Sequence, residues 1–195
     1  MSKINEARKE IESLISDYAT VRIKFKDVQK SHPEYLEGND NYIGIIGEYW
    51  AKIFLETLPQ NTGLKIVNSS SEGNKSEKWV DFKIKKDNIQ EDINVKAISS
   101  ENKKLESGTI KLKDRNKENI CSILIVKLND ELFPEQLLYI RDIDTNLINR
   151  DYIKYRSKPQ NNIYFKYDAN IGFEEVYNNQ IYIYEDNKFI QKVKS

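Results

Sequence analysis

A run of mainly apolar residues near the middle of the chain, residues 120–128, constrains the fold most strongly. Its residues are mainly β-branched or aliphatic and do not alternate with polar ones, which is typical of a strand buried on both faces. Such a strand needs a layer of structure on each side of its sheet. We therefore expect an α/β domain with a central mixed β-sheet flanked by helices.

Two helices and several shorter strands are expected around this run. Apolar residues at three- and four-residue spacing predict an amphipathic packing helix over residues 5–29. Asn39 or Asp40 can cap a second helix that runs to about Thr57 and is apolar around most of its circumference. Further strands are expected at residues 64–67, 79–85, 89–98, 136–140, 163–167, 181–184 and 189–193.

The strands at residues 79–85 and 89–98 are expected to form a hairpin, because Asp87 and Asn88 between them are typical turn residues. Side chains alternate along a strand, so one face of this hairpin is apolar and the other polar. The polar face carries Trp79, Asp81, Lys83 and Lys85 on one strand and Asp92, Asn94 and Lys96 on the other. A solvated face would give the same pattern. Glu48, a carboxylate within the apolar second helix, favours a functional interpretation, because burying it is costly unless a positive group meets it.

The composition narrows the chemistry that is open to the chain. Its 195 residues include one His (His32) and one Cys (Cys121), which excludes a disulfide framework and zinc sites built from several thiolates or imidazoles. Any metal site is therefore expected to use oxygen ligands. Cys121 lies inside the apolar run and is expected to be a core residue. The apolar runs are too short to cross a bilayer, so we expect no membrane association and a cytoplasmic location.

Glu48, Asp81 and the triplet Asn94-Val95-Lys96 resemble the motif of the PD-(D/E)xK nuclease superfamily, in particular small type II restriction endonucleases. The pattern of that superfamily is an acid on a helix, an Asp at the start of one hairpin strand and an acid-x-Lys triplet on the next. The order and the gap between Asp81 and the triplet match over residues 44–126. Asn94 departs from the pattern, because it stands where the superfamily usually has Asp or Glu.

The resemblance implies a restriction-endonuclease-like fold and a Mg²⁺-dependent, site-specific type II enzyme that hydrolyses phosphodiester bonds of double-stranded DNA. Asp81, Asn94, Lys96 and Glu48 would be the catalytic residues, and Asp81, Asn94 and Glu48 would bind the metal. Lys96 would orient the attacking water and stabilise the charge that develops on the phosphate. Residues 1–195 would form a single nuclease domain with a helical part (1–58), a catalytic sheet (64–128) and a β-rich part for possible DNA recognition (129–195). Small enzymes of this kind commonly act as homodimers.

Three alternatives stay open. Asp81-Phe82-Lys83 is itself an acid-x-Lys triplet, for which Glu72 or Glu77 would supply the earlier acid. A junction-resolving or repair nuclease of the same superfamily would use the same residues on a different substrate. A catalytically inactive nuclease-like module that binds DNA or a protein is the third alternative, with Asn94 as the mark of a decayed site.

The net charge is zero, with 31 basic and 31 acidic residues, so DNA binding would depend on local patches. Residues 96–117 include seven bases and three acids, and residues 150–166 include five bases and one acid. Phosphate contacts in such patches would make the affinity sensitive to salt. The candidate nucleic-acid-binding residues are Lys103, Lys104, Lys111, Lys113, Arg115, Lys154, Arg156 and Lys158.

Overall fold

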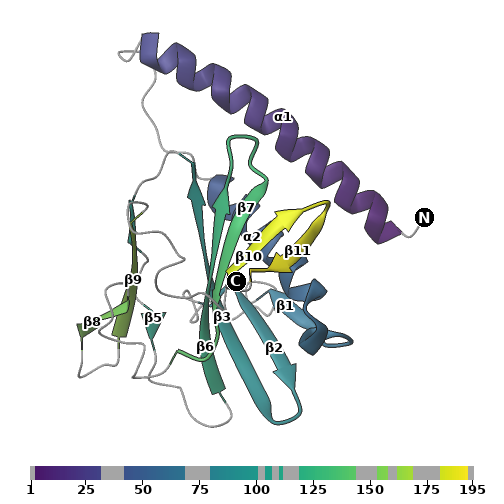
Figure 1. The fold of residues 1–195 in the computed structure, drawn as a ribbon, viewed down its shortest axis with the longest axis vertical. Coiled ribbons are helices and arrows are strands. Elements are labelled where there is room, and N and C mark those ends of the chain that lie inside the picture. Colours follow the sequence, from purple (N-terminus) through teal and green to yellow (C-terminus); the bar gives the residue numbers. More distant parts are fainter. Residues whose placement is uncertain are drawn as a thin grey trace.

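The computed structural model describes residues 3–31, 42–68, 80–100, 104–106, 110–111, 119–143, 153–157, 162–168 and 181–192. These residues begin with helices α1 (Lys3–Ser31) and α2 (Tyr42–Thr57) and a short 3-10 helix, η1 (Pro59–Asn61). The strands follow: β1 (Ile66–Asn68), β2 (Phe82–Lys86), β3 (Ile89–Ser99), β4 (Lys104–Glu106), β5 (Ile110–Lys111), β6 (Asn119–Leu128), β7 (Pro134–Ile140), β8 (Ile153–Ser157), β9 (Asn162–Asp168), β10 (Ile181–Glu185) and β11 (Lys188–Gln191) (Figure 1).

A mixed sheet of seven strands, in the order β1-β2-β3-β6-β7-β10-β11, forms the centre of the fold. Neighbouring strands are antiparallel except β3 and β6, which are parallel. A parallel pair requires the chain to return to the starting end of the sheet between the two strands. Here that connection includes β4 and β5, which pair with β9 in a second, smaller sheet that β8 also joins.

The hairpin and the buried central strand are confirmed. β2 and β3 pair with Phe82 opposite Ile93, and the turn between them has Asp87 at a φ of 53°, a left-handed conformation that Asp tolerates better than most residues. In β6, side chains on both faces are buried, with Ile123 through Val126 at 0% exposure. Cys121 is buried in this strand, as expected of a core residue.

The two faces of the main sheet are covered by different kinds of structure. Helices α1 and α2 contribute to a core with residues such as Phe82, Ile93 and Leu124 on one face. On the other face, residues such as Ile123 and Ile125 form a second core with Ile153, Ile163 and Phe165 of β8 and β9. Figure 1 shows β8 and β9 to the left of the main sheet. The α/β class is therefore confirmed, but strands, not helices, cover the second face among the described residues. Apolar side chains that alternate along β8 and β9 supply the same cover that a helix would.

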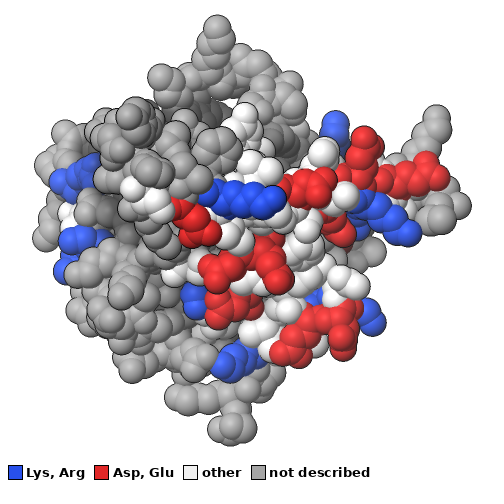
Figure 2. All heavy atoms as spheres, turned by 90° about the horizontal axis from the view of Figure 1, so that it is seen from above, with Lys and Arg blue, Asp and Glu red and all other residues white. Residues whose placement is uncertain are grey.

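Helix α1 confirms the expected helix but differs from the expected packing. Ile15 and Ala19 are buried against the rest of the protein, whereas Leu14 is 60% exposed and Val21 is 46% exposed. Figure 2 views the molecule from above the view of Figure 1 and shows acidic side chains across the centre and the right, with basic side chains among them. No helix among the described residues has the length and apolar character needed to cross a bilayer.

Candidate active site

A close approach between α2 and β3 places Glu48 beside the triplet. A Cβ atom built on Gly47 would lie 2.4 Å from the Cβ of Ala97, so a residue with any side chain would force the helix and the strand apart. Glycine at this position lets the helix backbone rest on the strand. Glu48 follows Gly47 on the helix and Lys96 precedes Ala97 on the strand. The contact therefore brings the acid of α2 to the part of β3 that carries Lys96.

Asp81 is fixed against the same part of β3. It directly precedes β2, and its backbone N–H donates to the carbonyl oxygen of Ile93 at 2.9 Å. Its Oδ2 accepts hydrogen bonds from the backbone N–H of Val95 at 2.6 Å and from the Asn94 side-chain amide at 3.2 Å. Three hydrogen bonds thus hold Asp81 beside the triplet, across the hairpin.

Asn94 presents its amide to Asp81. A carboxylate only accepts hydrogen bonds, so the Nδ2 group must face Asp81 and the Oδ1 atom must point elsewhere. This Oδ1 atom is buried and accepts no hydrogen bond from the part of the chain that the structure describes. Asn94 therefore stands beside Asp81 without adding a second negative charge, and its side chain keeps one buried oxygen that can act as a ligand.

Lys96 brings the positive charge of the site. Its side chain is half-buried, and its Nζ donates to the carbonyl oxygen of Val95 at 2.9 Å. Burial raises the pKa of both Asp81 and Glu48, and the Lys96 ammonium opposes this rise at each of them, so its charge acts on both carboxyls. Lys83 of the alternative triplet is buried on β2, opposite Asp92 in the hairpin register.

The surroundings of Glu48 and Asp81 disfavour the charged forms of both carboxyls. Burial raises the pKa of Glu48, the Asp81 charge raises it further, and Lys96 partly opposes the rise. Burial also raises the pKa of Asp81, against the opposing effects of the Val95 N–H and Lys96. Two carboxylates and one ammonium from three different elements therefore meet, with an excess of negative charge. Such an arrangement suits a site that receives a cation.

Replacing Glu48 with glutamine is expected to raise thermal stability at neutral pH. Because the pKa of Glu48 is raised in the folded state, its ionised form destabilises the fold at pH 7, and this penalty disappears as the pH falls to the raised pKa and below. Thermal unfolding between pH 7 and pH 4 should show a gain for Glu48→Gln at pH 7 that shrinks on acidification. Glu131→Gln, at a solvent-exposed carboxylate, should show no such gain. An unchanged or lower midpoint for Glu48→Gln at pH 7 would contradict the expected strain.

The oxygen donors of this site fit a hard divalent cation. Among the described residues, no three His, Cys, Asp or Glu side chains come together as a metal-binding group. The donor set is instead two carboxylates, from Glu48 and Asp81, together with the buried amide oxygen of Asn94. Oxygen ligands of this kind are those that Mg²⁺ prefers, and Mg²⁺ completes its coordination with water.

The expected nucleic-acid-binding residues are only partly covered by the structure. Lys154 and Arg156 are exposed on β8, and the guanidinium carbon of Arg156 lies 5.2 Å from the centre of the Tyr164 ring. The backbone places Lys104 on β4 and Lys111 on β5. The other members of that set, and residues of the alternative interpretations, lie outside the described residues: Lys103, Lys113, Arg115, Lys158, Glu72, Glu77, Trp79 and His32.

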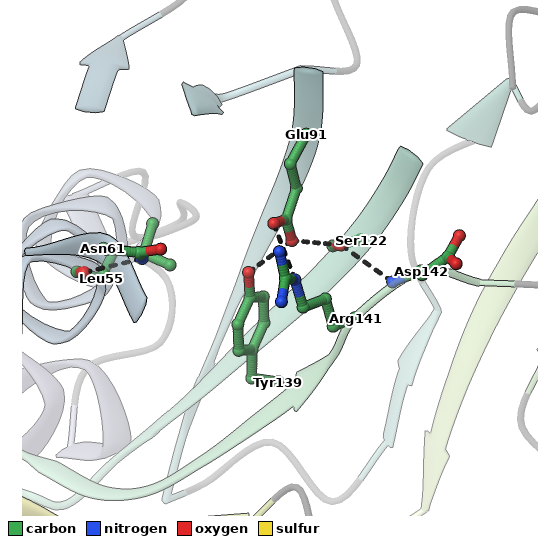
Figure 3. A network of polar contacts seen from close by, with 7 residues as sticks. All are labelled: Leu55, Asn61, Glu91, Ser122, Tyr139, Arg141 and Asp142. Atoms are coloured by element: carbon green, nitrogen blue, oxygen red, sulfur yellow. Dashed lines mark hydrogen bonds and ion pairs between the residues drawn. The ribbon is translucent and has the colours of Figure 1, made fainter. Parts of the chain in front are cut away.

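A second polar cluster, which the sequence interpretation missed, is built around Glu91 of β3 (Figure 3). The buried Glu91 carboxylate accepts hydrogen bonds from Ser122 Oγ at 2.6 Å, from Arg141 Nε at 3.0 Å and from the Tyr139 hydroxyl. Burial and the Glu91 charge raise the pKa of Tyr139 well above its ordinary value, so the phenol is a neutral donor. The signal was present in the sequence, because Glu91 occupies the apolar face of its strand, two residues before Ile93.

Comparison with protein-family models, with curated proteins and with solved structures gave no match for this chain.

Proposed function

We propose that the chain is a Mg²⁺-dependent, site-specific type II endonuclease with a restriction-endonuclease-like fold that hydrolyses phosphodiester bonds of double-stranded DNA. The observation that supports it is that Glu48 of α2, Asp81 directly before β2 and Lys96 of β3 act on one another electrostatically. The close approach of Gly47 to Ala97 holds the backbone of α2 against β3, next to Glu48 and Lys96. Charges scattered over a surface would not need such a contact. The mixed sheet and the hairpin agree with the fold that this proposal requires.

The roles of the residues follow from their charges and contacts. Glu48, Asp81 and Asn94 would hold Mg²⁺ through oxygen atoms. When bound, the ion would polarise the scissile phosphate and make a better nucleophile of water. Lys96 is held by the Val95 carbonyl close to Asp81, so its ammonium would orient the attacking water and neutralise charge on the phosphate oxygens. A lysine suits this task because its ammonium acts as a compact point charge.

The partners that this function requires are DNA and a second copy of the chain. One small domain cuts one strand, and two-fold symmetry supplies the second cut. Lys154 and Arg156 are the described members of the basic set that are exposed to solvent, and we propose that they contact phosphates. Stacking against Tyr164 would hold the Arg156 guanidinium in place for such a contact. Phosphate contacts by these residues would allow the chain to bind DNA although its net charge is zero.

Incubation with duplex DNA and Mg²⁺ tests the proposal, and a pair of lysine variants tests the assignment of the triplet. Lys96→Ala is expected to reduce cleavage about 10²–10³-fold, by analogy with the loss of a single charge-stabilising group elsewhere. Lys83→Ala should retain cleavage wherever it folds, because Lys83 lies opposite Asp92 in the hairpin register, whereas Lys96 acts on the charges of Glu48 and Asp81. Gel analysis of cleavage with matched EDTA controls measures both. Loss of cleavage in Lys83→Ala alone, in folded protein, would assign the triplet to Asp81-Phe82-Lys83. Absence of any Mg²⁺-dependent cleavage of nucleic acid would count against the enzyme.

A catalytically inactive nuclease-like module is the second candidate function. It is favoured by the hydrogen bond between Asn94 and Asp81, in which an amide occupies the carboxylate that an active site would offer to metal. An active site should show a Mg²⁺-dependent rise in the unfolding midpoint, because an ion that binds the folded state stabilises it. An inactive module should show none. Branched and damaged duplexes in the same cleavage assay distinguish a junction-resolving or repair nuclease from a restriction enzyme.

A further inference from the structure

The β2–β3 hairpin extends beyond the strands that pair with it on either side. The pairing of β1 with β2 ends at Ile66 and Ile84, and β6 begins at Asn119, opposite Gln90. Among the described residues, positions 85–89 therefore form a two-stranded end of the sheet that no third strand joins. These five residues are exposed, and Figure 1 shows the hairpin end at the bottom of the view, away from α1.

Three lysines gather at this end of the sheet. Lys85 and Lys86 are the last two residues of β2. Lys65 directly precedes Ile66, so continuing the register of β1 and β2 by one position sets it beside Lys85. All three lysines are exposed, and the turn of the hairpin adds one acid, Asp87, so that these four charges sum to +2. We call Lys65, Lys85 and Lys86 the basic end.

The basic end lies on the same hairpin as the candidate active site, within reach of one duplex. Alternation along β2 sets Lys85 on the face of the hairpin that carries Asp81, whose backbone N–H donates to β3. The two residues are four positions apart, which is about 13 Å at the rise of a strand. Phosphates recur about every 3.4 Å along the axis on each strand of a DNA duplex. A duplex that presents one phosphate to the site can therefore present others to the basic end.

The charges of the candidate active site favour a cationic surface close by. Two carboxylates, Glu48 and Asp81, meet one ammonium, Lys96, so the site by itself repels a phosphate. Lysines on the same hairpin offset this repulsion and attract the DNA backbone toward the site. The basic end thus has the charge that the carboxylates lack for a polyanionic substrate.

We infer that the basic end binds backbone phosphates of the DNA duplex that the candidate active site cuts. This inference rests on the proposed function, because the occupant is its substrate. Lysine ammonium groups bind phosphate as point charges, and phosphate contacts fix the position of a duplex without reading its sequence. The basic end is separate from the proposed contacts of Lys154 and Arg156, which lie on β8 of the smaller sheet.

The salt dependence of DNA binding tests this inference. Each phosphate contact steepens the fall of log affinity with log salt by about one unit. Fluorescence anisotropy of a labelled duplex of mixed sequence, in Mg²⁺ and between about 50 and 200 mM salt, measures this slope. The parent protein and all variants carry Lys96→Ala, so that the DNA stays largely uncut. Lys85→Gln/Lys86→Gln is expected to reduce the slope by about two units, and Lys65→Gln by about one.

The matched control is Lys24→Gln/Lys188→Gln, which removes two exposed lysines from α1 and β11 and reaches the same net charge. Its slope should equal that of the parent, and circular dichroism shows that each variant is folded. Equal slopes for the parent and Lys85→Gln/Lys86→Gln would overturn the inference and leave the proposed function standing. Equal reductions in the two double variants would assign the effect to net charge and also overturn it. A parent protein that binds no duplex DNA at any of these salt concentrations would contradict the proposed function as well.

Discussion

Asp81→Asn is expected to abolish Mg²⁺-dependent DNA cleavage without unfolding the protein. The asparagine oxygen can still accept the hydrogen bonds that the Val95 N–H and the Asn94 amide donate to Asp81. What the variant removes is the negative charge that would bind the metal. Metal catalysis contributes several kcal/mol of transition-state stabilisation, so a fall in rate of about 10²–10³-fold or more is expected. Single-turnover cleavage at saturating protein measures this change separately from DNA affinity.

The matched control is Asp87→Asn in the turn of the same hairpin. It makes the same chemical change at an exposed residue, and asparagine tolerates the positive φ of 53° found there. Asp87→Asn should therefore retain full cleavage and stability. The unfolding midpoint of Asp81→Asn should be no lower than that of the wild type, because burial raises the pKa of Asp81 and penalises its charged form. Cleavage by Asp81→Asn within a few-fold of the wild-type rate would remove Asp81 from the proposed site.

Local patterns were sufficient to predict the parts of the fold that surround the candidate site. The apolar run at residues 120–128 predicts β6, and the turn residues Asp87 and Asn88 predict the β2–β3 hairpin with its apolar and polar faces. Both patterns are decided by neighbours along the chain, through alternation and turn chemistry. The meeting of Glu48 with this hairpin was expected from the cost of burying a carboxylate and from the resemblance of Glu48, Asp81 and the triplet to a nuclease motif. Its geometric cause, the contact between Gly47 and Ala97, depends on residues fifty positions apart.

The features that were not predicted depend on contacts between distant segments. β8 was interpreted only as part of a basic segment, yet Ile153 completes the second core together with Phe165 of β9. The apolar spacing of α1 predicts a helix but does not say which stripe the protein covers; Ile15 is buried while its neighbour Leu14 is exposed. The alternation of side chains along β3 indicates that Glu91 faces the core. It does not indicate which groups donate hydrogen bonds to the Glu91 carboxylate, because Ser122 and Arg141 come from β6 and from the residue after β7.

Glu91→Ala is expected to produce the largest loss of stability among the described residues discussed above. The Glu91 carboxylate is almost completely buried and joins three parts of the main sheet: its own strand β3, Ser122 of β6, and Tyr139 and Arg141 at the end of β7. Removing it leaves two buried hydroxyls and a guanidinium without their acceptor. Breaking a buried charged network by removing one member costs about 3–5 kcal/mol. In a chain of this size that corresponds to a fall in unfolding midpoint of roughly 2–4 °C for each kcal/mol.

Urea unfolding followed by circular dichroism measures this loss, and two further variants show its cause. Glu91→Gln keeps an oxygen acceptor for Ser122 or Tyr139 but removes the charge that faces Arg141, so its loss of stability should lie between those of the wild type and Glu91→Ala. Glu135→Ala breaks an exposed ion pair with Lys127, whose Nζ lies 3.1 Å from the Glu135 Oε1, and should cost less than about 1 kcal/mol. Equal effects of Glu91→Ala and Glu135→Ala would mean that the Glu91 network contributes no more than a surface ion pair. In that case apolar packing between β3, β6 and β7 would alone hold the centre of the sheet together.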